Sequence, residues 1–266
     1  MKAALRQLIP RPLRRAVRRL VRPPIYRGDF ATWAEAQRAA RGYAEPAIAE
    51  KVIAAARAVR DGRAAWERDT ILFAEPAANA PLLRALRRAA AAHGGRLRVA
   101  DFGGALGSTW WQHRLWLADL AEVSWAVIEQ PALVEAGRRE FTTGPLQFFF
   151  SLDECAAATP PDVLLLSSVL PYLENPRALL AAAAARPFRH AIIDRTGFVA
   201  RGRDRLTVQH VPPAIYDASY PCWFFDRASL FAAFAPGWRI AEEWVTDDEA
   251  DIDAEHRGVH FERNAP

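Results

Sequence analysis

Apolar positions recur with helical spacing through the first third of the chain. Ala, Val and Leu return every three or four residues in three segments, and glycine pairs or Asp-Gly follow two of them, which predicts helices with defined ends. The three segments are residues 32–41, 46–60 and 81–93. We therefore expect residues 30–95 to form a helical N-terminal region.

After residue 96 the pattern changes to short apolar runs separated by helical segments. The runs predict strands at 97–101, 124–129, 146–150, 163–167 and 191–194, with helices at 106–121, 131–141 and 176–185. Strands that are apolar on both faces and alternate with helices are typical of parallel βαβ units covered on both sides. Residues 96–266 are therefore predicted to form an α/β domain with a doubly wound, mostly parallel sheet. A helix near 226–234 and strands near 238–244 and 259–262 would complete it.

A polar and aromatic stretch, residues 196–225, separates the fifth predicted strand from the last helix. It exceeds the usual length of a connection, so we expect a functional loop or lid. Its prolines restrict the backbone, and its aromatic rings and hydroxyls suit a sugar or another amphipathic molecule. The stretch is our predicted substrate loop.

The charge is unevenly distributed along the 266 residues. The formal charge is +4, but nine Arg and Lys residues and no acid lie within residues 1–27, so the remainder carries −5 (+4 minus 9). The cations thus define a basic arm, residues 1–29, and not a nucleic-acid-binding face on the folded body. No apolar run is long enough for a signal peptide or a membrane span. We expect a cytoplasmic protein whose arm could contact the anionic inner surface of a membrane, a packed or solvated arm being the alternative.

The strongest local motif is the glycine-rich segment that follows the first predicted strand. Glycines at such a turn let the backbone approach a ligand closely, and an acid at the strand end can engage a cation or a hydroxyl group. In this segment, small residues stand two, four and six positions after an acid, a pattern typical of adenosylmethionine sites. The segment fits the G-x-G-x-x-G pattern of dinucleotide sites poorly. The predicted contacts are Asp101, Gly103, Gly104, Ala105, Gly107 and Ser108.

Further cofactor contacts are expected where the next strands end. Glu129 closes the second strand, where its carboxylate could take both ribose hydroxyls, and Gln130 follows it. The less favoured alternative is that Glu129 is an exposed charge at the strand end that caps the next helix. Asp153 could meet the adenine or simply cap a helix, and Ser167 ends the fourth strand. The two cysteines, Cys155 and Cys222, have no partner at metal-ligand spacing, so we expect no metal.

Three residues are candidates for the chemistry on the acceptor. Tyr172 follows the fourth strand and could form a wall of the acceptor pocket, or pack under the loop. His210 could take a proton from an attacking hydroxyl, although a single histidine is more often structural. Asp194, at the end of the fifth strand, is another candidate base, with pairing to Arg195 or to a loop amide as the simpler explanation.

These residues together resemble a family of uncharacterised bacterial proteins assigned as S-adenosylmethionine-dependent (class I) methyltransferases and often encoded near surface-polysaccharide genes. The resemblance covers about residues 30–243 and rests on DFGGxLGS from Asp101, the Glu129-Gln130 pair, and the VPPxIYxxSYP motif from Val211. It implies a seven-stranded sheet with an antiparallel edge, and adenosylmethionine over the first two strands. It does not identify the acceptor, because fold alone does not determine the substrate.

Three functions remain open from the sequence. The first is a methyltransferase acting on a saccharide, a glycolipid precursor or another small molecule. The second is a nicotinamide-dependent oxidoreductase on the same type of sheet, which the missing third glycine disfavours. The third is a non-catalytic protein that keeps the fold and docks at a membrane or an assembly through its arm.

Overall fold

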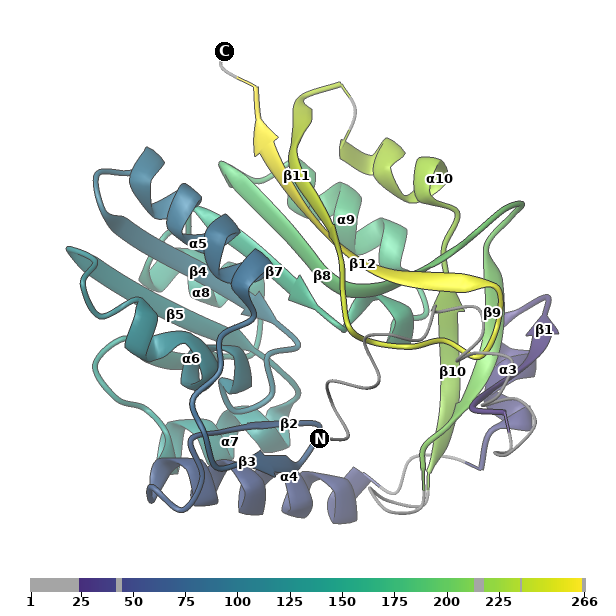
Figure 1. The fold of residues 1–266 in the computed structure, drawn as a ribbon, viewed down its shortest axis with the longest axis horizontal. Coiled ribbons are helices and arrows are strands. Elements are labelled where there is room, and N and C mark those ends of the chain that lie inside the picture. The colour runs from purple at the N-terminus through teal and green to yellow at the C-terminus, as the bar shows by residue number, and fades with distance from the viewer. Residues whose placement is uncertain (1–23, 42–44, 213–217, 235, 265–266) are drawn as a thin grey trace, which may run out of the picture.

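The computed structural model describes residues 24–41, 45–212, 218–234 and 236–264. Its centre is one seven-stranded sheet (Figure 1). The strands are β4 (Arg96–Phe102), β5 (Glu122–Ile128), β6 (Leu146–Phe149), β7 (Val163–Ser167), β8 (His190–Val199), β11 (Trp238–Val245) and β12 (Ala254–Arg263). All five predicted strands of the parallel part are present, and both C-terminal strands are as well.

The strand order of this sheet is β11-β12-β8-β7-β4-β5-β6. Strands β4 to β8 pair in parallel, whereas β12 runs antiparallel to β8 and β11 antiparallel to β12. Strand β4 therefore lies between β5 and β7, and the chain crosses from one side of β4 to the other after β6. The order and the antiparallel edge confirm the class I methyltransferase fold that the resemblance implies.

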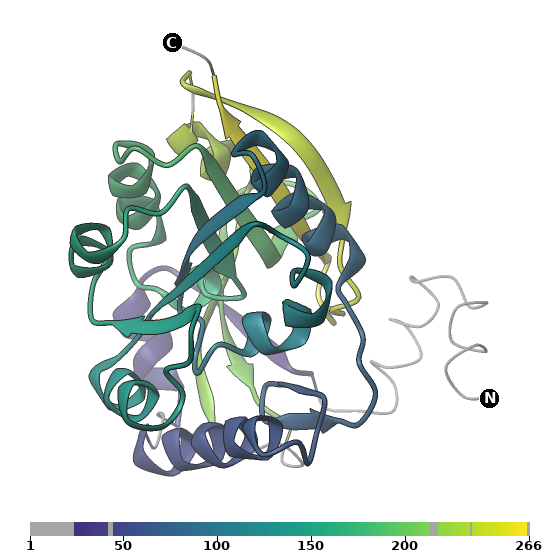
Figure 2. The same cartoon turned by 90° about the vertical axis from the view of Figure 1, so that its left-hand side faces the viewer.

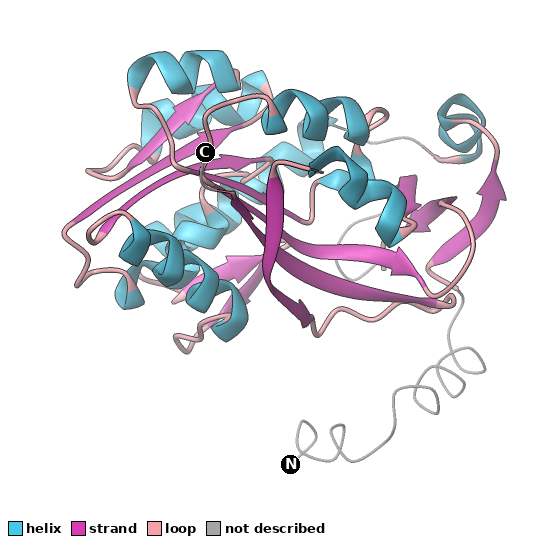
Figure 3. Ribbon diagram, turned by 90° about the horizontal axis from the view of Figure 1, so that it is seen from above, coloured by secondary structure: helices cyan, strands magenta, loops and turns pink. Residues whose placement is uncertain are grey.

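Helices cover both faces of the sheet, as the apolar strands predicted (Figure 3). One face packs against α5 (Ala80–Ala92), α6 (Ser108–His113) and α7 (Pro131–Glu140), with Trp125 fully buried in this layer. The other face packs against α8 (Leu152–Ala158), α9 (Pro176–Ala184) and α10 (Arg227–Phe231). Alternate residues of β4 belong to the two cores, Val99 to the first and Ala100 to the second. The sheet is thus buried on both sides, which is the physical origin of its continuous apolar runs.

The predicted N-terminal helices are present as α3 (Trp33–Ala39), α4 (Glu45–Arg60) and α5. Between α4 and α5 the chain also forms a hairpin of β2 (Trp66–Arg68) and β3 (Ile71–Phe73), which the sequence did not predict. The hairpin lies beside α4 at the base of the molecule (Figure 2). Its two-residue turn is Asp69-Thr70 instead of a glycine-containing pair, so the usual sequence signal of a tight hairpin is missing.

The prediction that residues 196–225 form a loop is wrong, because most of this stretch lies in strands. Strand β8 continues to Val199, and β9 (Arg205–His210) and β10 (Ser219–Phe224) form a second sheet with β1 (Tyr26–Phe30), in the order β1-β9-β10. Pro221 lies inside β10, although a proline in the sequence usually indicates that a strand is interrupted. It is tolerated because β10 is an edge strand of the small sheet. Strand β1 also shows that the C-terminal end of the predicted arm belongs to this small sheet.

Other differences are local. The helix predicted at 106–121 is shorter, because α6 gives way to a 3₁₀ turn at Arg114–Trp116 and Leu117 is fully buried where the chain turns back. No helix within the described ranges is long and apolar enough to cross a membrane. The greater part of the basic arm, residues 1–23, lies outside the described residues.

Candidate active site

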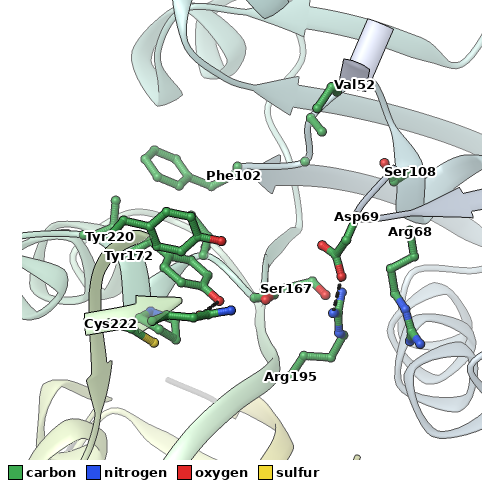
Figure 4. Close-up of a pocket in the computed structure, with 18 of the residues that line it drawn as sticks. Val52, Arg68, Asp69, Phe102, Ser108, Ser167, Tyr172, Arg195, Tyr220 and Cys222 are labelled. Carbon is green, nitrogen blue, oxygen red and sulfur yellow. Dashed lines mark hydrogen bonds and ion pairs between the residues drawn. The ribbon is translucent and has the colours of Figure 1, made fainter. Parts of the chain in front are cut away.

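A cavity of about 880 Å³ opens where β4, β5 and β7 end. Its walls include the strand ends of the central sheet, the β2–β3 hairpin and the small β1-β9-β10 sheet, together with residues of α4 and of the segment between β11 and β12. Figure 4 shows Tyr172, Tyr220 and Cys222 on one side of this space and Asp69, Arg68 and Ser108 on the other. Ligands of doubly wound sheets bind at the carboxyl ends of the strands where the strand order switches, which is where this cavity lies.

Backbone strain is concentrated around the cavity. Five non-glycine residues of the described chain have a positive φ, and all five line this space. They are Asp69, Thr70, Ala105, Ser168 and Arg195, with φ between 51° and 67°. Such conformations cost of the order of 1–3 kcal/mol each and gather at functional sites, where the surrounding structure holds them. The strain is therefore a second, independent reason to take this cavity as the candidate site.

Asp101 lies beneath the glycine turn with 1% of its surface exposed. Its Oδ2 accepts a hydrogen bond from Trp125 Nε1 at 2.9 Å, whereas its Oδ1 is buried without a partner. Burial raises the pKa of Asp101 to about 7. A Cβ placed on Gly104 would lie 2.6 Å from this carboxyl group, so glycine is required there by close approach.

Glu129 follows β5 and lines the same cavity. Its Oε2 accepts the backbone N–H of Gln130 at 2.6 Å. Burial raises the pKa of Glu129, and the backbone amides of Gln130 and Ala105 oppose this shift. Gln130 and Ser167 line the cavity as well, so the three residues predicted at the ends of β5 and β7 come together with Asp101.

The hairpin supplies a second buried carboxyl group, Glu67, with 5% of its surface exposed. Glu67 accepts hydrogen bonds from the hydroxyl of Ser108 and from the backbone N–H of Thr70, the latter at 3.2 Å. Burial raises the pKa of Glu67, while these two donors lower it. Glu67 therefore ties the hairpin to the end of the glycine turn.

Arg195 enters the cavity from a bulge in β8. Two residues of β8, Asp194 and Arg195, stand opposite the single Gly258 of β12, and such bulges redirect side chains next to active sites. The Arg195 guanidinium pairs with Asp69 at 3.0 Å and with Asp248 at 3.2 Å (Figure 4 draws the pair with Asp69). Burial opposes its charge, but the two carboxylates outweigh burial and raise the pKa of Arg195.

The small sheet and the segment after β7 form the remaining wall. The Tyr172 hydroxyl donates to Gln209 Oε1 at 2.9 Å, and its ring meets that of Tyr220 edge to face with centroids 5.2 Å apart. Burial raises the pKa of Tyr172, so this hydroxyl stays protonated and is a donor. The prediction that Tyr172 forms part of the pocket wall agrees with this position.

Four predicted site residues do not line the cavity. His210, which the sequence placed in a loop, is the last residue of β9; its neighbours Gln209 and Val211 line the cavity, and side chains alternate along a strand. Asp153 is exposed and pairs with Arg186 at 2.7 Å instead of reaching the cavity. Gly107 has a φ of 84° and begins α6 against Leu146, so its role is in the turn.

Asp194 is the fourth of these residues. It is fully buried and accepts hydrogen bonds from Trp244 Nε1 at 3.0 Å and from Asn79 Nδ2 at 3.2 Å. Ser167 Oγ donates to it as well, at 3.4 Å. Burial raises the pKa of Asp194 to about 6. These contacts bind Asp194 into the sheet and the start of α5, and leave it no place on the cavity wall.

Several cavity residues carried no signal in the sequence. Glu67 and Asp69 belong to the unpredicted hairpin, and Asp248 lies in the segment between β11 and β12. His256 also lines the cavity, is 8% exposed, and has an unpartnered Nδ1. Burial lowers the pKa of His256, so this ring is neutral at neutral pH.

Comparison with known proteins gives structural similarity only. No family model matches the chain, and no curated protein matches it. The N-terminal domain of EvdMO1, solved with S-adenosylhomocysteine, is 20% identical over 79% of this chain and 95% of that chain, with a TM-score of 0.47. CalS10, an amino pentose methyltransferase from Micromonospora echinaspora solved with S-adenosylmethionine, is 15% identical over 79% and 96%, with a TM-score of 0.46.

The magnesium protoporphyrin IX methyltransferase ChlM from Synechocystis PCC 6803, solved with S-adenosylhomocysteine, is 14% identical over 69% of this chain and 83% of that chain, with a TM-score of 0.45. At such low identities and TM-scores, none of these proteins assigns a substrate to this chain. The fold assignment rests on the strand order of the sheet, and function has to be argued from the cavity.

Proposed function

We propose that the chain is an S-adenosylmethionine-dependent methyltransferase whose acceptor is a saccharide or another small molecule. One observation carries the proposal: a buried carboxylate oxygen, Asp101 Oδ1, lies without a partner under a glycine turn at the carboxyl edge of the sheet. A buried polar atom without a hydrogen bond costs free energy, so a site that keeps one is suited to a ligand that supplies the missing donor. The α-ammonium group of adenosylmethionine is such a donor.

The other residues of this half of the cavity fit the rest of the cofactor. Glu129 lies at the end of the adjacent strand, where its carboxylate can accept the two ribose hydroxyls. Ile128 and Phe150 line the same cavity and offer apolar surface to the adenine, whereas the exposed Asp153 does not line it. The residues present therefore suit an adenosyl cofactor.

When bound, adenosylmethionine supplies a methyl group on a sulfonium centre. The protein must hold an acceptor atom in line with that methyl group, and positioning alone can provide much of the rate enhancement. The wall formed by Tyr172, Gln209 and Tyr220 combines aromatic rings with hydrogen-bonding groups. Such a wall suits a ligand with apolar faces and hydroxyl groups, which supports a saccharide acceptor.

The experiment is an acceptor screen with S-adenosylhomocysteine formation as the readout. Purified protein and adenosylmethionine are incubated with neutral sugars, amino sugars and lipid-linked glycans. We expect turnover of at least one class, and a reduced affinity for the cofactor in the Glu129→Ala variant with little change in its unfolding midpoint. Tight cofactor binding without turnover of any acceptor would favour the non-catalytic alternative.

We also propose that the protein acts in the cytoplasm and that its basic arm contacts anionic membrane surfaces. The support is the sequence of residues 1–27, where apolar residues and nine cations are interspersed. Sedimentation with anionic liposomes, with and without residues 1–23, tests this contact. Equal sedimentation of the two forms would remove the membrane role.

A further inference from the structure

Two carboxyl groups of the described cavity are buried and form no direct ion pair, although the more distant charge of Arg195 lowers the pKa of one of them, Glu67. Asp101 is 1% exposed and Glu67 is 5% exposed, and both line the cavity. Among the described residues, neither forms an ion pair with a lysine, arginine or histidine. Burying a carboxylate is unfavourable unless it is paired, so two unpaired carboxyl groups in one cavity indicate a site for a cationic ligand.

The two carboxyl groups contact opposite ends of the glycine turn. Asp101 lies against Gly104, where an added Cβ would come within 2.6 Å of its carboxyl group. Glu67 accepts the hydroxyl of Ser108, where α6 begins. One carboxyl group from the sheet and one from the hairpin therefore contact the two ends of the segment from Gly104 to Ser108.

The hairpin holds Glu67 in a fixed position. The backbone N–H of Thr70 donates to Glu67 Oε2 at 3.2 Å, across a turn whose two central residues both have positive φ. Asp69 at the same turn is anchored by Arg195 at 3.0 Å. These contacts leave the second lone pair of each Glu67 oxygen available, and a third donor can therefore be accommodated.

We propose that Glu67 and Asp101 together bind the α-ammonium group of adenosylmethionine, so that the β2–β3 hairpin, outside the central sheet, completes the cofactor site. This inference rests on the proposed function. An ammonium group carries three N–H donors, which matches two carboxylates from different directions. Hydrogen bonds between charged groups are stronger than neutral ones, so Glu67 determines affinity for the amino-acid part of the cofactor.

The test compares two adenosyl compounds by calorimetric titration. S-Adenosylhomocysteine carries the α-ammonium group, whereas 5′-methylthioadenosine lacks the amino-acid part. We expect the Glu67→Gln variant to bind S-adenosylhomocysteine about tenfold more weakly and 5′-methylthioadenosine as the unchanged protein does. The Glu140→Gln variant is the matched control, because Glu140 also connects the N-terminal region to the sheet domain, through Arg57 at 2.7 Å, but does not line the cavity.

Two results would overturn the inference. An unchanged affinity of Glu67→Gln for S-adenosylhomocysteine would show that Glu67 does not contact the ligand. Equal weakening for both compounds would show that Glu67 only holds the hairpin. If Glu67→Gln does not unfold cooperatively, the Glu67→Asp variant replaces it, because aspartate keeps the charge and withdraws the carboxylate by one methylene. The same selective loss of affinity for S-adenosylhomocysteine is expected. Failure of the proposed function looks different, because the unchanged protein would then bind neither compound.

Discussion

Gly104 is the position where one added carbon should disturb the site most directly. Its φ is not positive, so no left-handed backbone conformation requires glycine there, and we expect the effect of Gly104→Ala to be steric. The new Cβ would lie 2.6 Å from Asp101 Cγ and Oδ2 and 2.9 Å from Oδ1. All three distances are below any normal contact of a Cβ atom, so something must move.

Asp101 has little freedom to move away. Its Oδ2 is bonded to Trp125 Nε1 at 2.9 Å, and Trp125 is fully buried in the core between the sheet and its helices. Overpacking of this kind typically costs about 1–3 kcal/mol. We therefore expect Gly104→Ala to lower the free energy of unfolding by that amount and to weaken S-adenosylhomocysteine binding, because the displaced carboxyl group lies in the proposed cofactor site.

Urea unfolding, followed by tryptophan fluorescence, and calorimetric titration measure the two effects. Gly144→Ala is the control, since nothing lies within 4 Å of its added Cβ and its φ is also not positive. That variant should match the unchanged protein or be slightly more stable. If Gly104→Ala unfolds at the same urea concentration and binds the cofactor equally well, the arrangement around Asp101 is not as described.

Three further predictions follow from individual side chains. His210→Gln should leave cofactor affinity and turnover unchanged, because His210 does not line the cavity. A large loss of S-adenosylhomocysteine formation relative to the unchanged protein would contradict this. Tyr172→Phe removes the hydroxyl that donates to Gln209, so it should raise KM for the acceptor while S-adenosylhomocysteine affinity, measured by calorimetry, stays the same. Asp101 has its pKa raised from 3.8 to about 7, so the folded protein keeps a proton that the unfolded chain loses. The free energy of unfolding should therefore fall as the pH rises from about 4 to about 7, and urea midpoints of Asp101→Asn should show less of this fall.

The central sheet could be predicted because its strands are buried on both faces. Leu164, Leu165 and Leu166 of β7 are all fully buried, and a run of this kind stands out against the helices on either side. The glycine turn could be predicted for a related reason. Gly103 and Gly104 approach Val169 and Asp101 so closely that an added Cβ atom would clash with them, so the structure requires glycine, and glycine is visible in the sequence.

The wall of the cavity that the small β1-β9-β10 sheet forms could not be predicted, because that sheet depends on pairing between strands far apart in the sequence. Strand β9 joins β1, about 180 residues earlier in the chain, and the pairing of Tyr26 with Gln209 leaves no local pattern. Pro221 further obscured β10, although an edge strand accepts it. Nor could the sequence show that Gln209 and not His210 lines the cavity, because the face that a strand residue occupies depends on the pairing of its strand.

The central claim is that this cavity binds an adenosyl cofactor, and calorimetric titration tests it most directly. The purified full chain is titrated with S-adenosylmethionine, S-adenosylhomocysteine and, as a control, NAD. We predict micromolar binding of both adenosyl compounds and no binding of NAD. Binding of NAD alone would assign the cavity to a nicotinamide cofactor, and no binding of any of the three to the folded protein would contradict the claim.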